Sequence, residues 1–248
     1  MKNWKFLQLN PKDLREPTQI QPGIQDSITP SGKNLAAALY RIYQTDKYNL
    51  VEISRRLNSF IPHFTEVKIK NDKANQQFII SLKDENGKEF SSRLLSEGTL
   101  RLLALCVLEF DNQHTGLICF EEPENGIHPF RIKAMAALLR DLTTDFSSPD
   151  MPLRQMIVNT HSPALLGELV KWKEDKTVSV GLSFLKKVIV DINDKRTIIK
   201  ATHIELASTN QDQPPVADKE SRRKFTIAEI KRYLETIDTK DAIKLLYD

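Results

Sequence analysis

The spacing of hydrophobic residues between positions 35 and 60 is that of amphipathic helices. Leu35–Tyr43 is strongly apolar, and in Leu50–Phe60 the apolar side chains fall roughly on one helical face. The pattern therefore predicts two helices, Leu35–Tyr43 and Leu50–Phe60.

The period changes in residues 64–93, where apolar and polar residues alternate. A turn sequence, Asp84–Gly87, separates the second alternating run from the short segment Glu89–Ser91. Alternation with a period of two is typical of strands with one buried face. We therefore expect a three-stranded antiparallel meander with one side in water.

From Leu94 onward, helical stretches alternate with short apolar runs of strand length. This order predicts an α/β fold, with a mostly parallel sheet flanked by helices, in addition to the antiparallel meander. The expected elements are a helix at Leu100–Phe110, a strand at Gly116–Glu121, a helix at Arg131–Leu142, a strand at Met156–Asn159 and a helix at Ser162–Val170.

The ends of the chain have a different character from the middle. Residues 1–30 contain four prolines and little periodicity, which predicts an extended lead-in lying on a partner surface. Residues 178–201 are expected to form a hairpin that turns at Asn193-Asp194. The expected divisions are a lead-in at 1–30, a main lobe at 31–205, a polar linker at 206–218 and C-terminal helices at 219–248.

Composition limits the class of protein. With 248 residues, of which 40% are hydrophobic and 28% charged, the chain can bury a sizeable core without a stapling metal. The longest apolar run, Leu102–Leu108, is much shorter than the ~20 residues of a membrane-spanning helix, so no membrane span is expected. The two cysteines, Cys106 and Cys119, lie in apolar runs, which favours a cytoplasmic protein without a zinc site.

The net charge of +3 does not indicate a dedicated nucleic-acid-binding domain. The densest basic run, Lys219–Lys224, includes an acid. It is more typical of a solvent-exposed segment leading into a helix than of a DNA contact. DNA is therefore a partner that the charge does not support.

A first candidate site is Leu95–Thr99, directly before the helix at Leu100. Ser96 can cap that helix, and Gly98 has no side chain that would cover the backbone. A helix N-terminus offers free N–H groups and a positive dipole end to an anion. A simple helix cap is the alternative interpretation.

A second candidate site follows the strand at 116–121, which ends in the adjacent acids Glu121 and Glu122. In open α/β sheets, ligands bind at the carboxyl ends of strands. Two acids there suit a hard cation such as Mg²⁺ together with a base that activates water. Because adjacent strand residues face opposite ways, we expect the two acids to divide these tasks. An ordinary acidic loop is the alternative.

The third candidate residue is His161, which comes where the apolar run at 156–159 meets the next helix. A single histidine at such a place is more often structural than catalytic. Its position after the other two segments favours a functional role.

Together these segments resemble the C-terminal lobe of an ABC-type ATPase head, in the group that includes RecF, SMC and related AAA family ATPases. Over about residues 90–170, Leu95–Thr99 resembles the signature motif, Leu117–Glu122 the Walker B strand, Pro123–Pro129 the D-loop and Asn159–Pro163 the switch-histidine segment. The resemblance implies ATP and Mg²⁺ as cofactors and a dimer of like or unlike heads.

The resemblance also implies a role for each matching residue. Ser96 and the backbone of Gly98 would touch the γ-phosphate of a nucleotide held by the opposite head, and Asn125 would face that head. Glu121 would lie at the position of Mg²⁺ and its water, Glu122 would be the general base, and His161 would hold the γ-phosphate and sense its loss.

Two positions depart from the family pattern. Glu121 stands where Walker B strands usually carry Asp, and Glu97 replaces the second glycine of the signature. The longer Glu121 side chain would alter metal geometry, and Glu97 brings a negative charge near the phosphates.

The sequence contains no phosphate-binding loop of the form Gly-x-x-x-x-Gly-Lys-Ser/Thr. Gly32-Lys33 is followed by Asn34, and Gly87-Lys88 by Glu89. We therefore expect half of an ATPase head, completed by a Walker A-bearing segment or chain. Alone, the chain is expected to bind ATP poorly and not to hydrolyse it.

The sequence leaves two other functions open. A truncated ATPase-like fold could serve as a non-catalytic interaction module. A metal-dependent nuclease would need an acid pair such as Asp191 and Asp194, but no matching glutamate motif precedes these residues. A role in DNA maintenance or phage defence is inferred from the family rather than from the residues.

Overall fold

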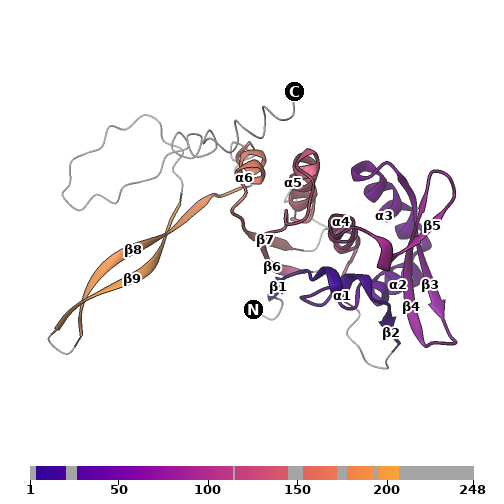
Figure 1. Cartoon of the computed structure of the whole chain (residues 1–248), viewed down its shortest axis with the longest axis horizontal. Helices are drawn as coiled ribbons and strands as arrows, with labels where there is room; N and C mark the ends of the chain where they lie inside the picture. Colours follow the sequence, from indigo (N-terminus) through magenta and orange to yellow (C-terminus); the bar gives the residue numbers. More distant parts are fainter. Residues whose placement is uncertain are drawn as a thin grey trace. The chain divides into compact units, whose positions relative to one another are not determined.

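The computed structural model describes residues 4–20, 27–113, 115–144, 153–171, 178–192 and 195–206 (Figure 1). The chain divides into two compact units, Met1–Ser162 and Pro163–Asp248. The division falls inside the stretch 31–205 that the sequence suggested as one lobe.

The centre of the first unit is a parallel sheet of β1 (Trp4–Leu7), β6 (Gly116–Glu121) and β7 (Arg154–Asn159), in the order β1-β6-β7. Both pairings are parallel, so the carboxyl ends of the three strands lie at one edge. At that edge Glu121 is the register partner of Asn159.

The opening residues differ from the expected extended lead-in. They form β1, which pairs with β6, and then α1 (Pro11–Arg15), whose first turn is capped by the Asn10 side chain accepting from the Lys12 amide at 3.0 Å. Leu7 and Leu14 are fully buried, so this segment is part of the core. Four strand residues with a distant partner leave no recognisable pattern in the sequence.

Helices α4 (Glu97–Glu109) and α5 (Ile132–Asp141) flank the parallel sheet (Figure 1). Every residue of Gly98–Leu108 is buried, and Met135, Ala136 and Leu138 form the buried side of α5. These observations confirm the expected α/β fold, in which a parallel sheet is flanked by helices.

An antiparallel sheet completes the first unit. Its strands are β2 (Thr18–Gln19), β3 (Phe64–Asp72), β4 (Gln77–Asp84) and β5 (Glu89–Ser91). β4 pairs with β3 along one side and with β2 and β5 on the other, so the expected meander gains one further strand. The helices α2 (Leu35–Thr45) and α3 (Lys47–Phe60) precede it, and α3 packs on β3.

The second unit contains α6 (Pro163–Val170) and a long hairpin of β8 (Gly181–Ile192) and β9 (Lys195–Leu206). The hairpin confirms the expectation for residues 178–201. The expected turn at 193–194, residues 207–218 of the expected linker and the C-terminal helices expected at 219–248 lie outside the described residues, whereas Leu206 is the last residue of β9. No helix among the described residues is both long and apolar enough to cross a membrane.

Two backbones touch where α4 begins. Gly98, in the first turn of α4, lies against Gly126 in the loop after β6. A Cβ atom at Gly98 would overlap the carbonyl oxygen of Gly126 and lie 3.4 Å from its carbonyl carbon. Gly126 itself has φ +75°, a conformation that L side chains rarely adopt. Glycine at both positions therefore permits the loop to pack directly on the helix.

This contact predicts that Gly98→Ala destabilises the protein although alanine is the better helix former. Because the added methyl has a backbone carbonyl in its way, we expect the free energy of unfolding to fall by ~1–3 kcal/mol. Urea unfolding measures the change, and Lys133→Ala, at an exposed position of α5, is the control. Equal stability of Gly98→Ala and the parent chain would show that the loop does not lie where the structure has it.

Candidate functional site

The acid pair lies at the carboxyl end of β6. Glu121 is the last residue of the strand and its side chain is exposed. Glu122 has left the strand: its φ is +45°, its amide donates to the Asn159 carbonyl at 2.8 Å, and its carbonyl accepts from the Asn125 amide at 3.1 Å. The backbone therefore leaves the strand conformation between the two acids, so the expected simple alternation along a strand does not apply to Glu122.

A positive φ is uncommon for a residue with a side chain and costs free energy that the surrounding structure must supply. Here the hydrogen bond from the Glu122 amide to β7 and the turn closed by Asn125 hold that backbone. Strained residues of this kind concentrate at functional sites. The conformation of Glu122 therefore supports the interpretation of this turn as a site rather than an ordinary acidic loop.

Ser96 begins α4 in the expected way. Its side-chain oxygen accepts from the Thr99 amide at 3.2 Å and lies 2.8 Å from the Thr99 hydroxyl. Ser96 is exposed, whereas Gly98 is buried against Gly126. The exposed start of α4 presents the positive end of the helix dipole to solvent, which favours an anion.

The short helix α1 supports the segment before Ser96. The Ser92 hydroxyl donates to the Arg15 carbonyl at 2.7 Å, and the Arg15 guanidinium reaches the Leu95 carbonyl at 3.5 Å. On the surface, Arg93 and Glu16 form an ion pair at 3.0 Å. The opening residues thus position the Leu95–Thr99 turn, a role that the sequence did not suggest.

The segment that carries His161 is hydrogen-bonded to the acid loop, which is the loop after β6 at residues 122–127. After β7, the Thr160 hydroxyl donates to the Glu124 carboxylate and accepts from the Ser162 amide at 2.9 Å. His161 is exposed. Within the described residues, the side chains of Glu122 and His161 are not joined to each other by a hydrogen bond or an ion pair. The structure therefore brings the two segments together through their backbones and through Thr160.

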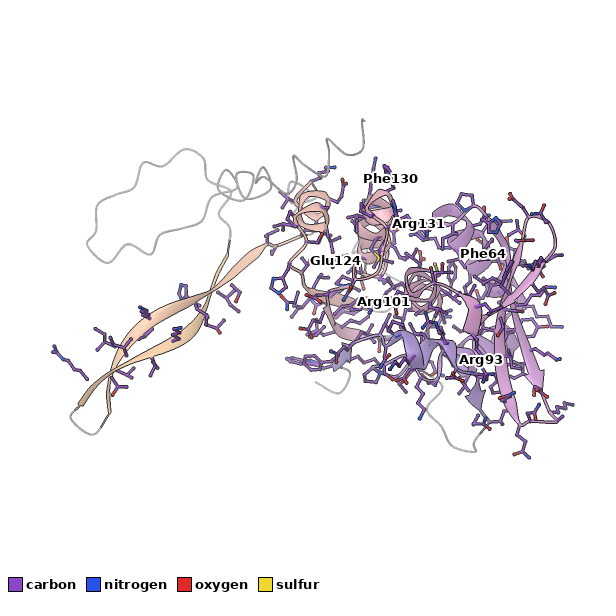
Figure 2. The ribbon with its side chains drawn as sticks, viewed as in Figure 1. Phe64, Arg93, Arg101, Glu124, Phe130 and Arg131 are labelled. Carbon is purple, nitrogen blue, oxygen red and sulfur yellow. The ribbon has the colours of Figure 1, made fainter. Side chains whose placement is uncertain are left out.

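Arg101 is a site residue that sequence reasoning missed. It lies on α4 (Figure 2), is only 9% exposed, and interacts electrostatically with Glu97, Glu122 and Glu124. Burial lowers the pKa of its guanidinium, and the three carboxylates favour the charged form. Its Nε atom and Oε2 of Glu124 are buried without a hydrogen-bond partner. An arginine among the apolar residues of α4 was the available signal.

Asn125 and the residues after it form the exposed rim of the site. Asn125 is exposed in the turn, and the rings of His128 and Phe130 stack with centroids 5.2 Å apart. Phe130 (Figure 2) and Leu94 are among the most exposed large apolar side chains. Asn125 thus lies at the surface, as a residue facing a partner must.

The residues fit a nucleotide with magnesium. No group of three acids, histidines or cysteines that could hold a metal occurs among the described residues. Mg²⁺ does not require one, because it is usually held by one or two carboxylates together with phosphate oxygens and water. Glu121, exposed at the strand end, can provide such a carboxylate, and the start of α4 can receive a phosphate.

Comparisons with solved structures find SMC head domains at low identity. A head domain with coiled coil and joint from Pyrococcus yayanosii is 13% identical, with a TM-score of 0.37. The match covers 50% of this chain and 24% of that structure's chain. An SMC head bound to the C-winged helix domain of ScpA is 14% identical, with a TM-score of 0.45, and covers 77% and 53% respectively. The match thus spans about a quarter of the first head structure and about half of the second.

A further similar structure comes from a study of ATP-driven dimerization and DNA-stimulated activation of SMC ATPases. It is 12% identical, with a TM-score of 0.39, and covers 65% of this chain and 88% of its own length. Comparison with curated proteins gives no significant match.

A family model gives the decisive match, since it covers residues 23–167, more than half of the 248. These residues include Ser96, Gly98, the acid pair, Asn125 and His161. The chain belongs to the family described as AAA domain, putative AbiEii toxin, Type IV TA system.

Proposed function

We propose that the chain supplies the signature turn, the acid pair and the switch histidine to a composite ATP-hydrolysing site. A segment or chain with a Gly-x-x-x-x-Gly-Lys-Ser/Thr loop completes that site. The observation that carries the proposal is that the loop after β6 contacts both other segments. It packs on α4 through Gly126 and Gly98, and it bonds to the end of β7 through Glu122 and Asn159.

The start of α4 binds the γ-phosphate of a nucleotide held by an opposite head. Ser96 is exposed and its hydroxyl lies at the helix N-terminus, where backbone amides and the dipole favour negative charge. Gly98 contributes by letting the loop approach, so that Asn125 reaches the same surface. A dimer of like or unlike heads would bring the two surfaces together.

The acids divide the chemistry at the end of β6. Glu121 holds the cation position, and Mg²⁺, when bound, neutralises phosphate charge. Glu122 accepts the proton of the attacking water, and its backbone, with φ +45°, is held by the hydrogen bond to the Asn159 carbonyl of β7. His161, two residues after the end of β7, contacts the γ-phosphate and senses its loss.

The physiological role follows from the family more than from the site. The family description names a putative toxin of a type IV toxin–antitoxin system, which supports a role in defence. DNA maintenance is the alternative role. Growth of phage on cells with and without the intact gene separates the two, because only a defence role predicts better phage growth without it.

The role of Glu122 predicts the behaviour of Glu122→Gln in the reconstituted ATPase. Loss of a general base reduces turnover by about 10²–10⁴-fold. Because glutamine preserves the shape of the side chain, we expect ATP still to bind and the assembled dimer to persist. Steady-state phosphate release and size-exclusion chromatography with ATP measure the two effects.

Glu85→Gln, at an exposed carboxylate in the turn between β4 and β5, is the matched control and should leave hydrolysis unchanged. Unchanged hydrolysis in Glu122→Gln would remove Glu122 from the role of base. An assembled complex that binds ATP and never hydrolyses it, even with Glu122 intact, would favour the non-catalytic interaction module instead.

The surroundings of Arg101 predict that it positions the acid loop. In Arg101→Met the three neighbouring carboxylates lose their cation, so residues 122–127 should open more readily. We expect their amide hydrogen exchange to accelerate about tenfold or more, a change of ~1.4 kcal/mol in opening free energy. Arg101→Lys keeps the charge and should exchange more slowly than Arg101→Met. Identical exchange in all three proteins would contradict this role.

A further inference from the structure

The long hairpin of β8 and β9 (Figure 1) exposes a row of large apolar side chains on one of its two faces. Its register pairs each odd-numbered residue of β8 with an even-numbered residue of β9, and directly paired residues share a face. This face carries Leu185, Ile189, Ile198 and Ile204, each 66–69% exposed. We call these four residues, together with the paired lysines Lys187 and Lys200, the hairpin face.

A hairpin of only two strands needs a further layer. An isolated two-stranded hairpin is marginally stable at best in water, and packing against a helix is one arrangement that stabilises it. β8 and β9 pair along 12 residues each, yet among the described helices and strands none packs extensively on either of them. Because large exposed apolar patches mark interaction sites, the hairpin face has the character of a packing surface.

The two lysines restrict what can cover the hairpin face. Lys187 and Lys200 are exposed and lie directly opposite each other in the register, between the level of Leu185 and the level of Ile189. Like charges directly opposite each other destabilise a strand pair. A suitable occupant therefore has an apolar side with carboxylates in line with it, because charge-assisted hydrogen bonds to carboxylates relieve the repulsion.

The sequence after β9 contains a segment with these properties, although it lies outside the described residues. Ile227, Ile230, Leu234 and Ile237 recur every three or four residues, which places them on one side of the helix that the sequence predicts there. Two acids follow at four-residue intervals from the last two of these and continue the same side. We call the six residues the distal stripe: Ile227, Ile230, Leu234, Ile237, Asp238 and Asp241.

We propose that the distal stripe docks on the hairpin face, with its two carboxylates beside Lys187 and Lys200. The helix then forms the second layer that the hairpin lacks. The lengths agree. The hairpin face from the level of Ile204 to the level of Ile189 spans about 20 Å at ~3.3 Å per strand residue. The distal stripe from Ile227 to Asp241 spans about 21 Å at ~1.5 Å per helical residue.

The connection and the charges favour docking within one chain. Residues 207–226 separate Leu206, the end of β9, from the distal stripe. A connection of that length can extend over about 60 Å, more than the roughly 40 Å of either strand, so the stripe can reach any part of the hairpin face. Tethering also raises the effective concentration of the occupant. Two hairpin faces from two copies would instead bring four lysines together in an apolar contact, which is unfavourable.

Amide hydrogen exchange of β8 and β9 in the full chain measures whether the hairpin face is covered. In the double variant Ile230→Asp, Leu234→Asp, docking would bury two new carboxylates against apolar side chains. We therefore expect exchange of the hairpin amides to accelerate about tenfold or more. Thr236→Asp introduces the same residue on the other side of the predicted helix and is the matched control, which should leave the exchange unchanged.

Hairpin exchange that is equal in the parent chain and in the double variant would overturn the proposal. Equal acceleration by Thr236→Asp would contradict docking through the distal stripe. Docking within one chain also predicts the same exchange rates at every chain concentration. Protection that grows with concentration would assign the hairpin face to a second copy and refute the intramolecular contact.

A charge exchange tests the contact between the lysines and the two acids. Lys187→Glu with Lys200→Glu keeps like charges opposite each other, so the repulsion within the hairpin remains while the attraction to the distal stripe becomes repulsion. Hairpin exchange should accelerate in this variant. Adding Asp238→Lys and Asp241→Lys should return it to the parent rate. Charge reversal without effect, or an effect that the second pair of substitutions does not reverse, would show that these groups do not meet.

Discussion

The close approach of two glycine backbones, Gly98 in α4 and Gly126 in the loop after β6, is the contact on which the rest of the site depends. With any side chain at Gly98, the loop would be displaced from the helix. The same loop is held from the other side by the hydrogen bond between the Glu122 amide and the Asn159 carbonyl, and by Thr160 on Glu124. One loop thus fixes the relative positions of segments that are far apart in sequence, as preorganised sites require.

The electrostatics of the site support the proposal that another segment or chain completes it. Glu97, Glu121, Glu122 and Glu124 gather around the end of β6 and the start of α4, whereas the buried cation among them is Arg101. A nucleoside triphosphate would meet net negative charge there, apart from the positive end of the helix dipole at Ser96. In the proposed composite site, a bound cation and a phosphate-binding loop supply the positive charge.

The sequence predicted the elements whose patterns are local. β6 has the predicted bounds because its apolar run is limited by Gly116 and by the two acids. Helix α2 and the antiparallel meander follow clear periodicities. The helix cap by Ser96 was also predictable, since capping involves residues three apart. Local patterns of this kind were therefore sufficient to predict the fold class and to locate the main site segments.

The remaining features depend on contacts between distant residues. β1 was missed because four residues show no period, and its burial arises only by pairing with β6. The packing of Gly98 on Gly126 and the turn at Glu122 leave no pattern in the sequence. Arg101 did leave one, a charge inside an apolar helix, but its carboxylate neighbours come from a separate loop. The roles of Glu122 and His161 in hydrolysis stay predictions.

Equilibrium binding of Mg·ATP, measured by titration calorimetry, tests most directly whether this chain is one half of a nucleotide site. The chain alone should give no saturable heat, and the chain together with a phosphate-loop segment should bind one nucleotide per site. Saturable binding and turnover of ATP by the purified chain by itself would contradict the idea that its acids and its signature turn await a partner.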